Sequence, residues 1–468
     1  MTDHKTGISD IGIYLPAYKI GLETVVEQRV AEIPRLARHL DRACRTTGQR
    51  AIRFPTVWED TATMAASSAH QLITANPELD PAGIRYLAVG TESGLDHSKP
   101  VASFVQGMLQ ASGVAVPESL SSFQVQHACA AGTISLLSVA SLLQASGRTD
   151  ESGVVICSDV ARYETHSTAE ITQGAGSVAL LVENDPQLVE LDLTTQGYCS
   201  RDVDDFFRPL GSKTAQVKGT YSMQMYHETL DSAFLNHCAR VGKSARQVLS
   251  ETDLVVLHAP FRNLPEMAMQ KLLSNHLGLD EDDARNYLEE RGLYDAINVV
   301  AEVGNIYTGA TYLALASQLY HQFQRHGGAI VGKRILIASY GSGNTMTVMS
   351  GVVAAGAPSV IGRWDLAAIV DGGRQASFAE YQQWINGPYV PTGLSHTPEL
   401  DGYTLPMFRL DSIRDDGYRV YGYHAPVAPA SGVNAAASAV SAATSPVSAA
   451  TSPVNAATSA VGANGREW

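Results

Sequence analysis

The chain has 468 residues, 45% of them hydrophobic, which is enough to bury a large core and suggests more than one domain-sized unit. A formal charge of −14, with no run of Lys or Arg, argues against nucleic-acid binding. We find no apolar stretch of the roughly 18 residues that a membrane span needs, so the sequence predicts no membrane association.

The cysteines are odd in number and widely spaced: Cys44, Cys129, Cys157, Cys199 and Cys238. No CxxC pair occurs, so the set predicts neither a disulfide framework nor a zinc site. Together with the acidic composition, this favours a reducing, cytoplasmic setting, and we expect no metal and no cofactor.

Strands and one long helix alternate in the first half of the chain. The buried-strand pattern YLAVG (86–90) ends just before Glu92, and a short strand FQVQ (123–126) leads into Cys129. Segment 129–147 is apolar on nearly every side, which predicts a buried helix that stops at Gly147. Two strands follow, VVICSDV (154–160) and GAGSVALLVE (174–183).

The second half repeats this order, which indicates an internal duplication. The strand DLVVLH (253–258) ends at His258, and a second helix that is apolar all round begins near Asn305 and runs to residue 319. The strands RILIASY (334–340) and GSGNTMTVMSG (341–351) close the set. Two such halves, which we place at 1–185 and 186–425, predict a layered α/β fold with pseudo-twofold symmetry.

Composition changes sharply near residue 425. Residues 426–468 consist mostly of Ala, Ser, Thr, Val and Pro in a near-repeat, with little large apolar mass. Such a segment does not bury enough surface to offset its ordering entropy, so we predict a disordered tail.

Four reactive side chains fall at the ends of predicted strands or at the start of a predicted helix: Glu92, Cys129, His258 and Asn305. Ligands of open α/β folds bind at the carboxyl ends of strands. A helix N-terminus also favours the thiolate form of a cysteine. Singly, each residue has a structural explanation: a core cysteine, a turn histidine, a capping carboxylate. Their equivalent places in a duplicated frame favour a catalytic role.

Several ordered segments strengthen this interpretation, and through them the chain resembles the hydroxymethylglutaryl-CoA synthase family of the thiolase superfamily over residues 7–425. The segments are IGIYLPAYKI (11–20), GTESGLDHSKPVAS (90–103), HACAAGT (127–133), CSDVARY (157–163), TQGAG (172–176), DDFFRPLG (204–211), LHAPF (257–261), GNIYTGATYLALAS (304–317) and SYGSG (339–343). The resemblance implies a thiolase-like αβαβα layered fold of two pseudo-symmetric halves, and a homodimer.

The resemblance also implies roles for individual residues. Cys129 matches the nucleophile that accepts an acyl group. Glu92 matches the general base that deprotonates the acyl methyl group, and a dry pocket would raise its pKa. His258 orients the carbonyl of the second substrate. The remaining implied substrate-binding positions, including a Gly-Ser turn that forms an oxyanion hole with the Cys129 N–H, are Tyr163, Thr172, Phe206, Asn305, Gly341 and Ser342.

Three departures from the family pattern bear on the substrate. Ala130 follows the nucleophile, where the family carries an aromatic residue, so we expect an aromatic group to be lost near the acyl site. Asn263 and Met267 replace lysines that meet CoA phosphates in the family, although Arg262 and Lys271 are near enough to compensate. Residues 165–170 replace a glycine-rich loop.

These observations leave four functions open. The first is synthesis of 3-hydroxy-3-methylglutaryl-CoA from acetyl-CoA and acetoacetyl-CoA for isoprenoid biosynthesis. The second is condensation in a natural-product pathway with donors on an acyl carrier protein, as in β-branching. The third is transfer of the Cys129-bound acyl group to an amine or alcohol. The fourth, a catalytically silent partner subunit, is disfavoured because no reactive residue is missing.

Overall fold

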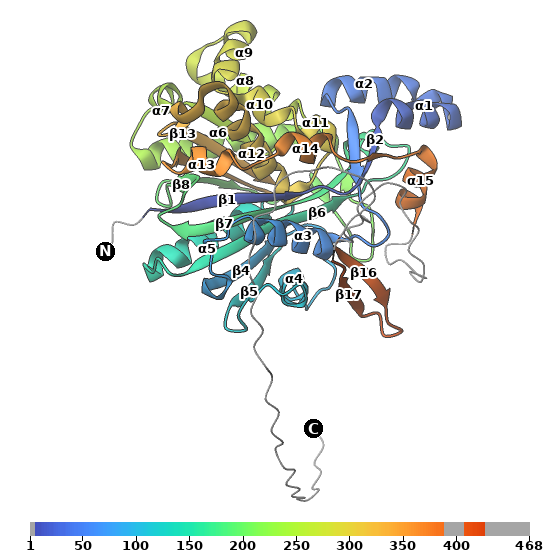
Figure 1. Cartoon of the computed structure of the whole chain (residues 1–468). Coiled ribbons are helices and arrows are strands. Elements are labelled where there is room, and N and C mark those ends of the chain that lie inside the picture. Colours follow the sequence, from blue (N-terminus) through green and yellow to red (C-terminus); the bar gives the residue numbers. More distant parts are fainter. Residues whose placement is uncertain (1–4, 388–406, 426–468) are drawn as a thin grey trace, which may run out of the picture. The chain divides into compact units, whose positions relative to one another are not determined.

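A ten-stranded mixed sheet runs through the body of the protein (Figure 1). The structure, a computed structural model, describes residues 5–387 and 407–425. The body, Met1–Pro426, is one compact unit. The tail predicted to be disordered, residues 426–468, lies outside the described residues. The two predicted halves, 1–185 and 186–425, share this sheet, and the division between them stays a prediction.

The order of the strands across the sheet mixes both halves of the chain. From one edge to the other it is β12 (Leu254–Leu257), β13 (Arg334–Gly341), β14 (Thr345–Val353), β8 (Val189–Leu191), β1 (Thr6–Tyr14), β7 (Gly174–Asn184), β6 (Ser152–Ala161), β4 (Ile84–Gly90) and β5 (Ser121–Val125), with β9 (Gly197–Ser200) paired to β14.

The pairing of the strands repeats between the halves, as the sequence duplication predicts. β4 pairs parallel with β6, which pairs antiparallel with β7. In the same way β12 pairs parallel with β13, which pairs antiparallel with β14. All seven strands predicted from the sequence form. The repeat is incomplete at β5, because Asn305 follows a short helix, α11 (Val300–Val303), rather than a strand.

The two apolar helices differ in burial. In α12 (Ala310–His326) every residue from Ala310 to Leu319 is buried, as predicted. The other helix, α5 (Ala131–Ser146), ends at Gly147 in a left-handed conformation, also as predicted, but it is not buried all round. One face packs on β4 and β6, while Leu142 near its C-terminal end is 44% exposed. The apolar pattern predicted burial of the whole helix, but the last turns of α5 reach the surface.

The same segment corrects the expectation about membrane-spanning length. Ala128–Ser146 has the length and mean hydropathy of a membrane span and is the single such helix within the described residues. In the structure it packs against the central sheet and is 56% buried, which is typical of a core helix in a water-soluble fold.

The remaining helices cover the sheet or surround its edges (Figure 1). They are α1 (Leu22–Glu32), α2 (Ala37–Thr47), α3 (Thr61–Thr74), α4 (Val101–Ala111), α6 (Gly219–Val241), α7 (Ala245–Glu251), α8 (Leu264–Leu277), α9 (Glu281–Glu290), α10 (Leu293–Ile297), α13 (Ala357–Ile361), α14 (Leu366–Asp371) and α15 (Phe378–Asn386). Short 3-10 helices occur at η1 (Pro34–Leu36), η2 (Pro81–Gly83), η3 (Glu170–Thr172), η4 (Tyr307–Gly309) and η5 (Gly327–Ile330).

Three small sheets complete the fold. One joins β2 (Tyr18–Gly21), β3 (Ala51–Phe54) and β15 (Arg374–Gln375), and another is the hairpin of β16 (Phe408–Ile413) and β17 (Arg419–Tyr423), which packs on α3 and α4. The third is a two-stranded ribbon, β10 (Phe206–Phe207) with β11 (Gln216–Val217). This ribbon follows the first strands of the second half and brings the DDFFRPLG segment to the candidate site.

Candidate active site

Cys129 lies in a tight turn between β5 and α5. Ala128 enters the turn with φ of +40°, a conformation that costs a residue other than glycine roughly 1–3 kcal/mol and often marks a functional site. The main-chain N–H of Ala130 donates to the carbonyl of His127 at 3.0 Å and closes the turn. Because α5 begins at Ala131, the thiol lies at the N-terminal end of this helix, as predicted.

The thiol is less acidic than the sequence suggested. Cys129 is 8% exposed, and burial raises the pKa of its thiol well above the ordinary value. The charges of Asp159, Glu92 and Asp205 raise this pKa further. We expected the helix N-terminus to favour the thiolate, but desolvation and three carboxylates outweigh it. The resting site therefore holds a protonated thiol.

A cavity of about 680 Å³ lies in front of Cys129. Seven of the nine predicted site residues line it: Cys129, Tyr163, Thr172, Phe206, His258, Asn305 and Ser342. They come from both halves of the chain and from elements that are far apart in sequence. Glu92 and Gly341, the other two, are not among the described residues of this lining.

Gly341 packs against the turn that carries Cys129, called the nucleophile turn below. It ends β13, and a Cβ placed there would lie 2.6 Å from the Cβ of Ala130 and 2.7 Å from the carbonyl oxygen of His127. Only glycine permits this approach. Ala130 is 1% exposed and packs on Gly341, so the residue after the nucleophile does not face the cavity. The expected loss of an aromatic group at this position, relative to the family, stays a prediction.

Aromatic side chains do surround the thiol, but they come from elsewhere. Tyr163, Phe206 and Tyr307 meet edge to face, with ring centroids 5.8 to 6.4 Å apart, and cluster with Cys129. Tyr307 lines the cavity with φ of +41°, a strained conformation at the start of η4. It was not among the predicted site residues, although it lies within the GNIYTG segment that carried the resemblance.

Asn305 is fixed by main-chain and side-chain contacts. Its Oδ1 accepts a hydrogen bond from the Tyr307 main-chain N–H at 2.8 Å, and its own N–H donates to the carbonyl of Thr172 at 3.1 Å. Its Nδ2 lies 3.4 Å from the hydroxyl of Tyr163. The amide is 3% exposed and faces the cavity, where it can hold a substrate carbonyl.

His258 follows β12 and is held by its main chain. Its N–H donates to the carbonyl of Ala338 at 2.7 Å, and its carbonyl accepts from the hydroxyl of Tyr226 at 2.7 Å. Its Nδ1 is buried and has no hydrogen-bond partner among the described residues. Burial lowers the pKa of His258 to about 3, so the imidazole is neutral at physiological pH. A neutral imidazole can donate one hydrogen bond to a carbonyl oxygen.

Glu92 is a buried carboxylate in the loop after β4. It is 7% exposed, and burial raises its pKa to about 8, the direction expected of a base in a dry pocket. Its charge contributes to the raised pKa values of Cys129 and Tyr307. Nε of Arg208 lies 3.3 Å from its Oε1, and the positive charge opposes the effect of burial.

Asp159 joins the loops that carry Glu92 and Asn305, and it was missed in the sequence. This carboxylate at the end of β6 is fully buried. Its Oδ1 accepts hydrogen bonds of 2.8 to 2.9 Å from Thr91 Oγ1, Glu92 N, Ser93 N and Ser93 Oγ. Its Oδ2 accepts from Thr308 N at 3.1 Å and Thr308 Oγ1 at 2.6 Å. The one signal in the sequence was an acidic residue at the end of a buried strand.

Arg262 and Lys271, the two cations expected near the thioester, both lie outside the lining of the catalytic cavity. Nη1 of Arg262 is 2.7 Å from Asn263 Oδ1 and 3.3 Å from Glu266 Oε2. Lys271 lines a separate surface hollow with Arg201 and His227. Neither Arg262 nor Lys271 is among the described residues that line the catalytic cavity. Asn263 and Met267 are not among these lining residues either, so compensation by Arg262 and Lys271 stays a prediction.

Helix α2 brings a histidine and an arginine to the catalytic cavity. His39 and Arg42 line it, and both are exposed to solvent. Arg35, Arg38 and Arg45 are exposed on the same segment, outside the cavity lining. Spacings of three and four residues place Arg35, Arg38, Arg42 and Arg45 along one side of the segment. A cationic row in a protein of charge −14 can bind a phosphate group or an acidic surface.

The segment that replaces the glycine-rich loop is anchored by a buried ion pair. Glu170, 1% exposed, accepts from Arg29 at 2.7 Å and from the hydroxyl of Tyr381 at 3.0 Å. This anchor holds η3 and the preceding turn, whose Thr168 and Ala169 line the cavity. The altered loop therefore forms part of the cavity wall, as expected from its position.

Within residues 5–387 and 407–425, no group of three or more His, Cys, Asp or Glu side chains is arranged to hold a metal ion. All five cysteines are free thiols.

Comparison with known proteins agrees with the geometry. Residues 3–187 match the profile of the hydroxymethylglutaryl-coenzyme A synthase N-terminal domain, and residues 284–387 match that of the C-terminal domain. A hydroxymethylglutaryl-CoA synthase of Haloferax volcanii is 31% identical over 327 residues, which cover 62% of this chain and 72% of that protein. The polyketide biosynthesis 3-hydroxy-3-methylglutaryl-ACP synthase PksG of Bacillus subtilis is 26% identical, covering 76% and 84%.

The fold is shared with solved structures of the same kind. MvaS in complex with 3-hydroxy-3-methylglutaryl coenzyme A superposes with a TM-score of 0.78 at 29% identity, covering 91% of this chain and all of that one. This likeness spans both halves of the body and confirms the thiolase-like layered fold predicted from the sequence. The chain therefore belongs to the hydroxymethylglutaryl-CoA synthase family and is an acyl thioester condensing enzyme.

Proposed function

We propose that the protein joins an acetyl and an acetoacetyl thioester into a 3-hydroxy-3-methylglutaryl thioester, with Cys129 as nucleophile and Glu92 as base. One observation carries this proposal: Cys129, His258 and Asn305 line a single cavity, and Asp159 hydrogen-bonds both to the main chain of Glu92 and to Thr308 in the turn after Asn305. A nucleophile, a base and two groups that bind carbonyl oxygens are the parts the reaction needs.

In the first step Sγ of Cys129 attacks the carbonyl carbon of the acetyl donor. The new C–S bond forms as the donor's C–S bond breaks, and the proton of the Cys129 thiol leaves with the departing thiol. The raised pKa of Cys129 makes this coupled transfer more suitable than a standing thiolate. The Cys129 N–H, with the end of β13 and Ser342, is placed to stabilise the oxyanion.

In the second step Glu92, as a carboxylate, takes a proton from the methyl group of acetyl-Cys129. The carbanion attacks the 3-oxo carbon of the acetoacetyl thioester, whose oxygen accepts hydrogen bonds from neutral His258 and from Asn305. The alkoxide formed takes the proton that Glu92 accepted. A carbon–carbon bond has formed, and the product is still bound to Cys129.

In the last step water adds to the thioester carbonyl at Cys129. The C–S bond breaks, the new carboxylic acid leaves, and the thiol of Cys129 is restored. The sequence of steps needs no cofactor beyond the thioester substrates themselves.

Helix α2 supports a phosphate-bearing handle on the thioester. Arg42 and His39 line the cavity, so a phosphate beside them would be paired while the acyl end reaches Cys129. CoA and the phosphopantetheine arm of a carrier protein share this chemistry. The main candidate is CoA, because the relative in Haloferax volcanii is a hydroxymethylglutaryl-CoA synthase and MvaS was solved with 3-hydroxy-3-methylglutaryl coenzyme A.

A carrier protein is the second candidate, and a specific observation favours it. Arg38 of α2 and Arg35 of η1 are exposed beside the cavity, outside its lining. Acidic carrier surfaces would complement these cations. Transfer of the acyl group to an amine or alcohol gains no support from the described residues that line the cavity.

The test is product analysis with matched donors. Wild-type protein and Cys129→Ala are incubated with acetoacetyl-CoA and either acetyl-CoA or an acetylated carrier protein, and products are identified by mass spectrometry. We expect a 3-hydroxy-3-methylglutaryl thioester from the wild type alone. Formation of N- or O-acetyl products instead would reject condensation in favour of acyl transfer.

Two further properties belong to this proposal. Strand β5 is an edge of the central sheet, with β4 as its one neighbour in the described part of the chain, and an edge strand can pair with its copy in a homodimer. Five free cysteines suit a reducing compartment, which is why we place the protein in the cytoplasm. Light scattering measures the mass of the assembly and tests the homodimer, and cell fractionation tests the location in the cytoplasm.

A further inference from the structure

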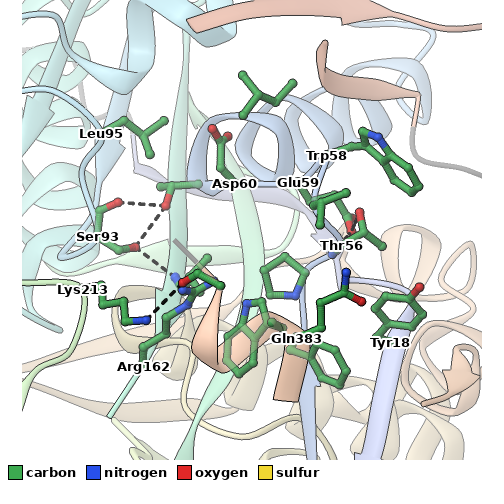
Figure 2. Close-up of a pocket in the computed structure, with 18 of the residues that line it drawn as sticks. Tyr18, Thr56, Trp58, Glu59, Asp60, Ser93, Leu95, Arg162, Lys213 and Gln383 are labelled. Atoms are coloured by element: carbon green, nitrogen blue, oxygen red, sulfur yellow. Dashed lines mark hydrogen bonds between the residues drawn. The ribbon is translucent and has the colours of Figure 1, made fainter. Parts of the chain in front are cut away.

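The ribbon of β10 and β11, with the loop between its strands, contributes side chains to the catalytic cavity and to a second one. Phe206 of this ribbon lines the catalytic cavity. Arg208, two residues later, lines the second cavity of about 360 Å³. Figure 2 shows this second cavity with Ser93, Arg162 and Lys213 on one side, and Trp58 and Tyr18 on the other. Ser93 follows Glu92 directly, so the second cavity lies behind the loop of the proposed base.

Arg208 makes two contacts with Glu92. Its Nε lies 3.3 Å from Oε1 of the carboxylate, and one terminal nitrogen donates to the main-chain carbonyl of the same residue. The arginine side chain is 15% exposed and the glutamate 9%, so water competes weakly for this pair. Oε2 of Glu92 is buried with no hydrogen-bond partner among the described residues. The two carboxylate oxygens are therefore unequal.

The segment that carries Arg208 is bonded to the second half of the fold through Asp205. Asp205 is fully buried, and its carboxylate accepts from the Tyr340 hydroxyl at 2.6 Å, the Gly343 N–H at 2.9 Å and the Ser222 hydroxyl at 3.0 Å. Its carbonyl accepts from the Lys218 N–H at 2.9 Å. The guanidinium of Arg208 is thus supplied from an anchored element, which suits a positioning role.

We propose that Arg208 is a positioning residue for Glu92: it fixes Oε1 and the main-chain carbonyl so that Oε2 alone faces the acyl methyl proton. The proposal rests on the proposed function of Glu92 as the base. It goes further in assigning each carboxylate oxygen a task and in naming the group that holds the carboxylate in place.

The contact with Arg208 also affects the pH range in which Glu92 is ionised and can act as a base. The titratable and charged groups around it are Arg208, Asp159, Cys129, Tyr163 and Tyr307. Burial raises the pKa of Glu92 to about 8, the charge of Arg208 lowers it, and Asp159 raises it. Removal of Arg208 should therefore raise this pKa further and reduce the fraction of carboxylate at neutral pH.

The experiment is single-turnover condensation. Enzyme with acetyl-Cys129 is mixed with acetoacetyl-CoA across a pH series, and the product formed is measured for wild type, Arg208→Met and Arg208→Lys. For Arg208→Met we expect unchanged acetyl loading, a condensation rate about tenfold lower or more at pH 7, and a midpoint at higher pH. Arg208→Lys should restore the midpoint but only part of the rate, because lysine is a point charge without the guanidinium fork.

Lys213→Met is the matched control. Lys213 is a cation of the same loop and the same cavity, but its Nζ donates to the carbonyls of Ile385 and Gly387 rather than to Glu92. We expect its pH midpoint to match the wild type. An unmoved midpoint in Arg208→Met, or equal shifts in both variants, would overturn the proposal. The thermal midpoint of each Arg208 variant shows whether it is folded. If one of the two is unfolded, the pH profile of the other tests the proposal.

The failure of this inference differs from the failure of the proposed function. If Glu92→Gln abolishes condensation while Arg208→Met behaves as wild type, Glu92 remains the base and Arg208 has no positioning role. If Glu92→Gln condenses normally, the base is another group, and the proposed function itself is wrong in that step.

Discussion

Oγ1 of Thr308 donates a 2.6 Å hydrogen bond to Oδ2 of Asp159, and this bond ties the turn after Asn305 to the loop that carries Glu92. The other oxygen of the same carboxylate accepts from the main-chain N–H of Glu92 at 2.8 Å. One buried side chain therefore sets the separation between the proposed base and the proposed carbonyl-binding amide. It is contributed by neither of the loops that it joins.

Asp159→Ala should lower both stability and activity. The substitution leaves several buried donors without an acceptor, and each such group costs about 1–3 kcal/mol. We expect a loss of at least about 3 kcal/mol in chemical denaturation and condensation near background. Asp150→Ala, a surface carboxylate of the same half, is the control. Normal stability in Asp159→Ala would contradict the network described above.

Cys129→Ala should abolish acyl loading. Among the cysteines, Cys129 alone lines the cavity within the described part of the chain. Intact mass after incubation with acetyl donors should show no added acetyl group in the variant and one in the wild type. Peptide mapping that places the acetyl group on Cys157 or another cysteine would remove Cys129 from the mechanism.

Glu92→Gln should load but not condense. Glutamine is similar in size to the glutamate but cannot accept the methyl proton at the rate needed, and general base catalysis contributes about 10²–10⁴-fold. The measurement is accumulation of acetyl-Cys129 with no consumption of acetoacetyl-CoA. A variant that fails to load at all would show that the carboxylate also assists the thiol.

The same substitution should change how stability depends on pH. Burial raises the pKa of Glu92 from its ordinary value of 4.5 to about 8, so the folded protein binds this proton more tightly than the unfolded chain. The resulting stabilisation is complete below the unfolded pKa and is lost as pH rises through about 8. Between pH 5 and pH 9, wild type should lose a few kcal/mol relative to Glu92→Gln in denaturant titrations. Parallel curves for the two proteins would mean that Glu92 is ionised throughout this range.

Charge reversal on α2 should separate the two kinds of donor. Arg42→Glu removes a cation from the cavity and should raise KM for acetyl-CoA and for an acetylated carrier protein alike, by about tenfold or more. Arg38→Glu lies outside the lining and should raise KM for the carrier alone. Glu27→Lys on α1 is a surface control. Equal effects of Arg38→Glu on both donors would show that α2 acts through its general field.

The fold was largely predictable because its signals are local. Buried strands such as 154–160 and 334–340 are continuous apolar runs, and the helix after Cys129 ends at a glycine that adopts the left-handed conformation. These features depend on neighbours in sequence. The exposed end of α5 was missed because its apolar composition matches that of the buried part, and only the extent of the sheet decides which turns are covered.

The site was predictable where residues follow strands and missed where contacts are long-range. Cys129 and His258 could be picked out as reactive groups at element ends. Arg208 contacts a residue 116 positions away, and Asp159 joins loops that are 149 and 67 positions from it. No periodicity marks such partners. The cations of α2 were missed because a surface arginine has the same pattern whether or not a cavity opens beside it.

The close approach of Gly341 to Ala130 limits how this enzyme can be engineered toward other acyl chains. Because a Cβ at 341 would lie 2.6 Å from the Cβ of Ala130, position 341 cannot accept a side chain unless the nucleophile turn moves. Variation in acyl chain length is better sought at residues that line the cavity from other elements, such as Phe206 and Thr168. A directed-evolution library confined to such positions would vary the acyl chains that the enzyme accepts, while the turn that holds Cys129 stays unchanged.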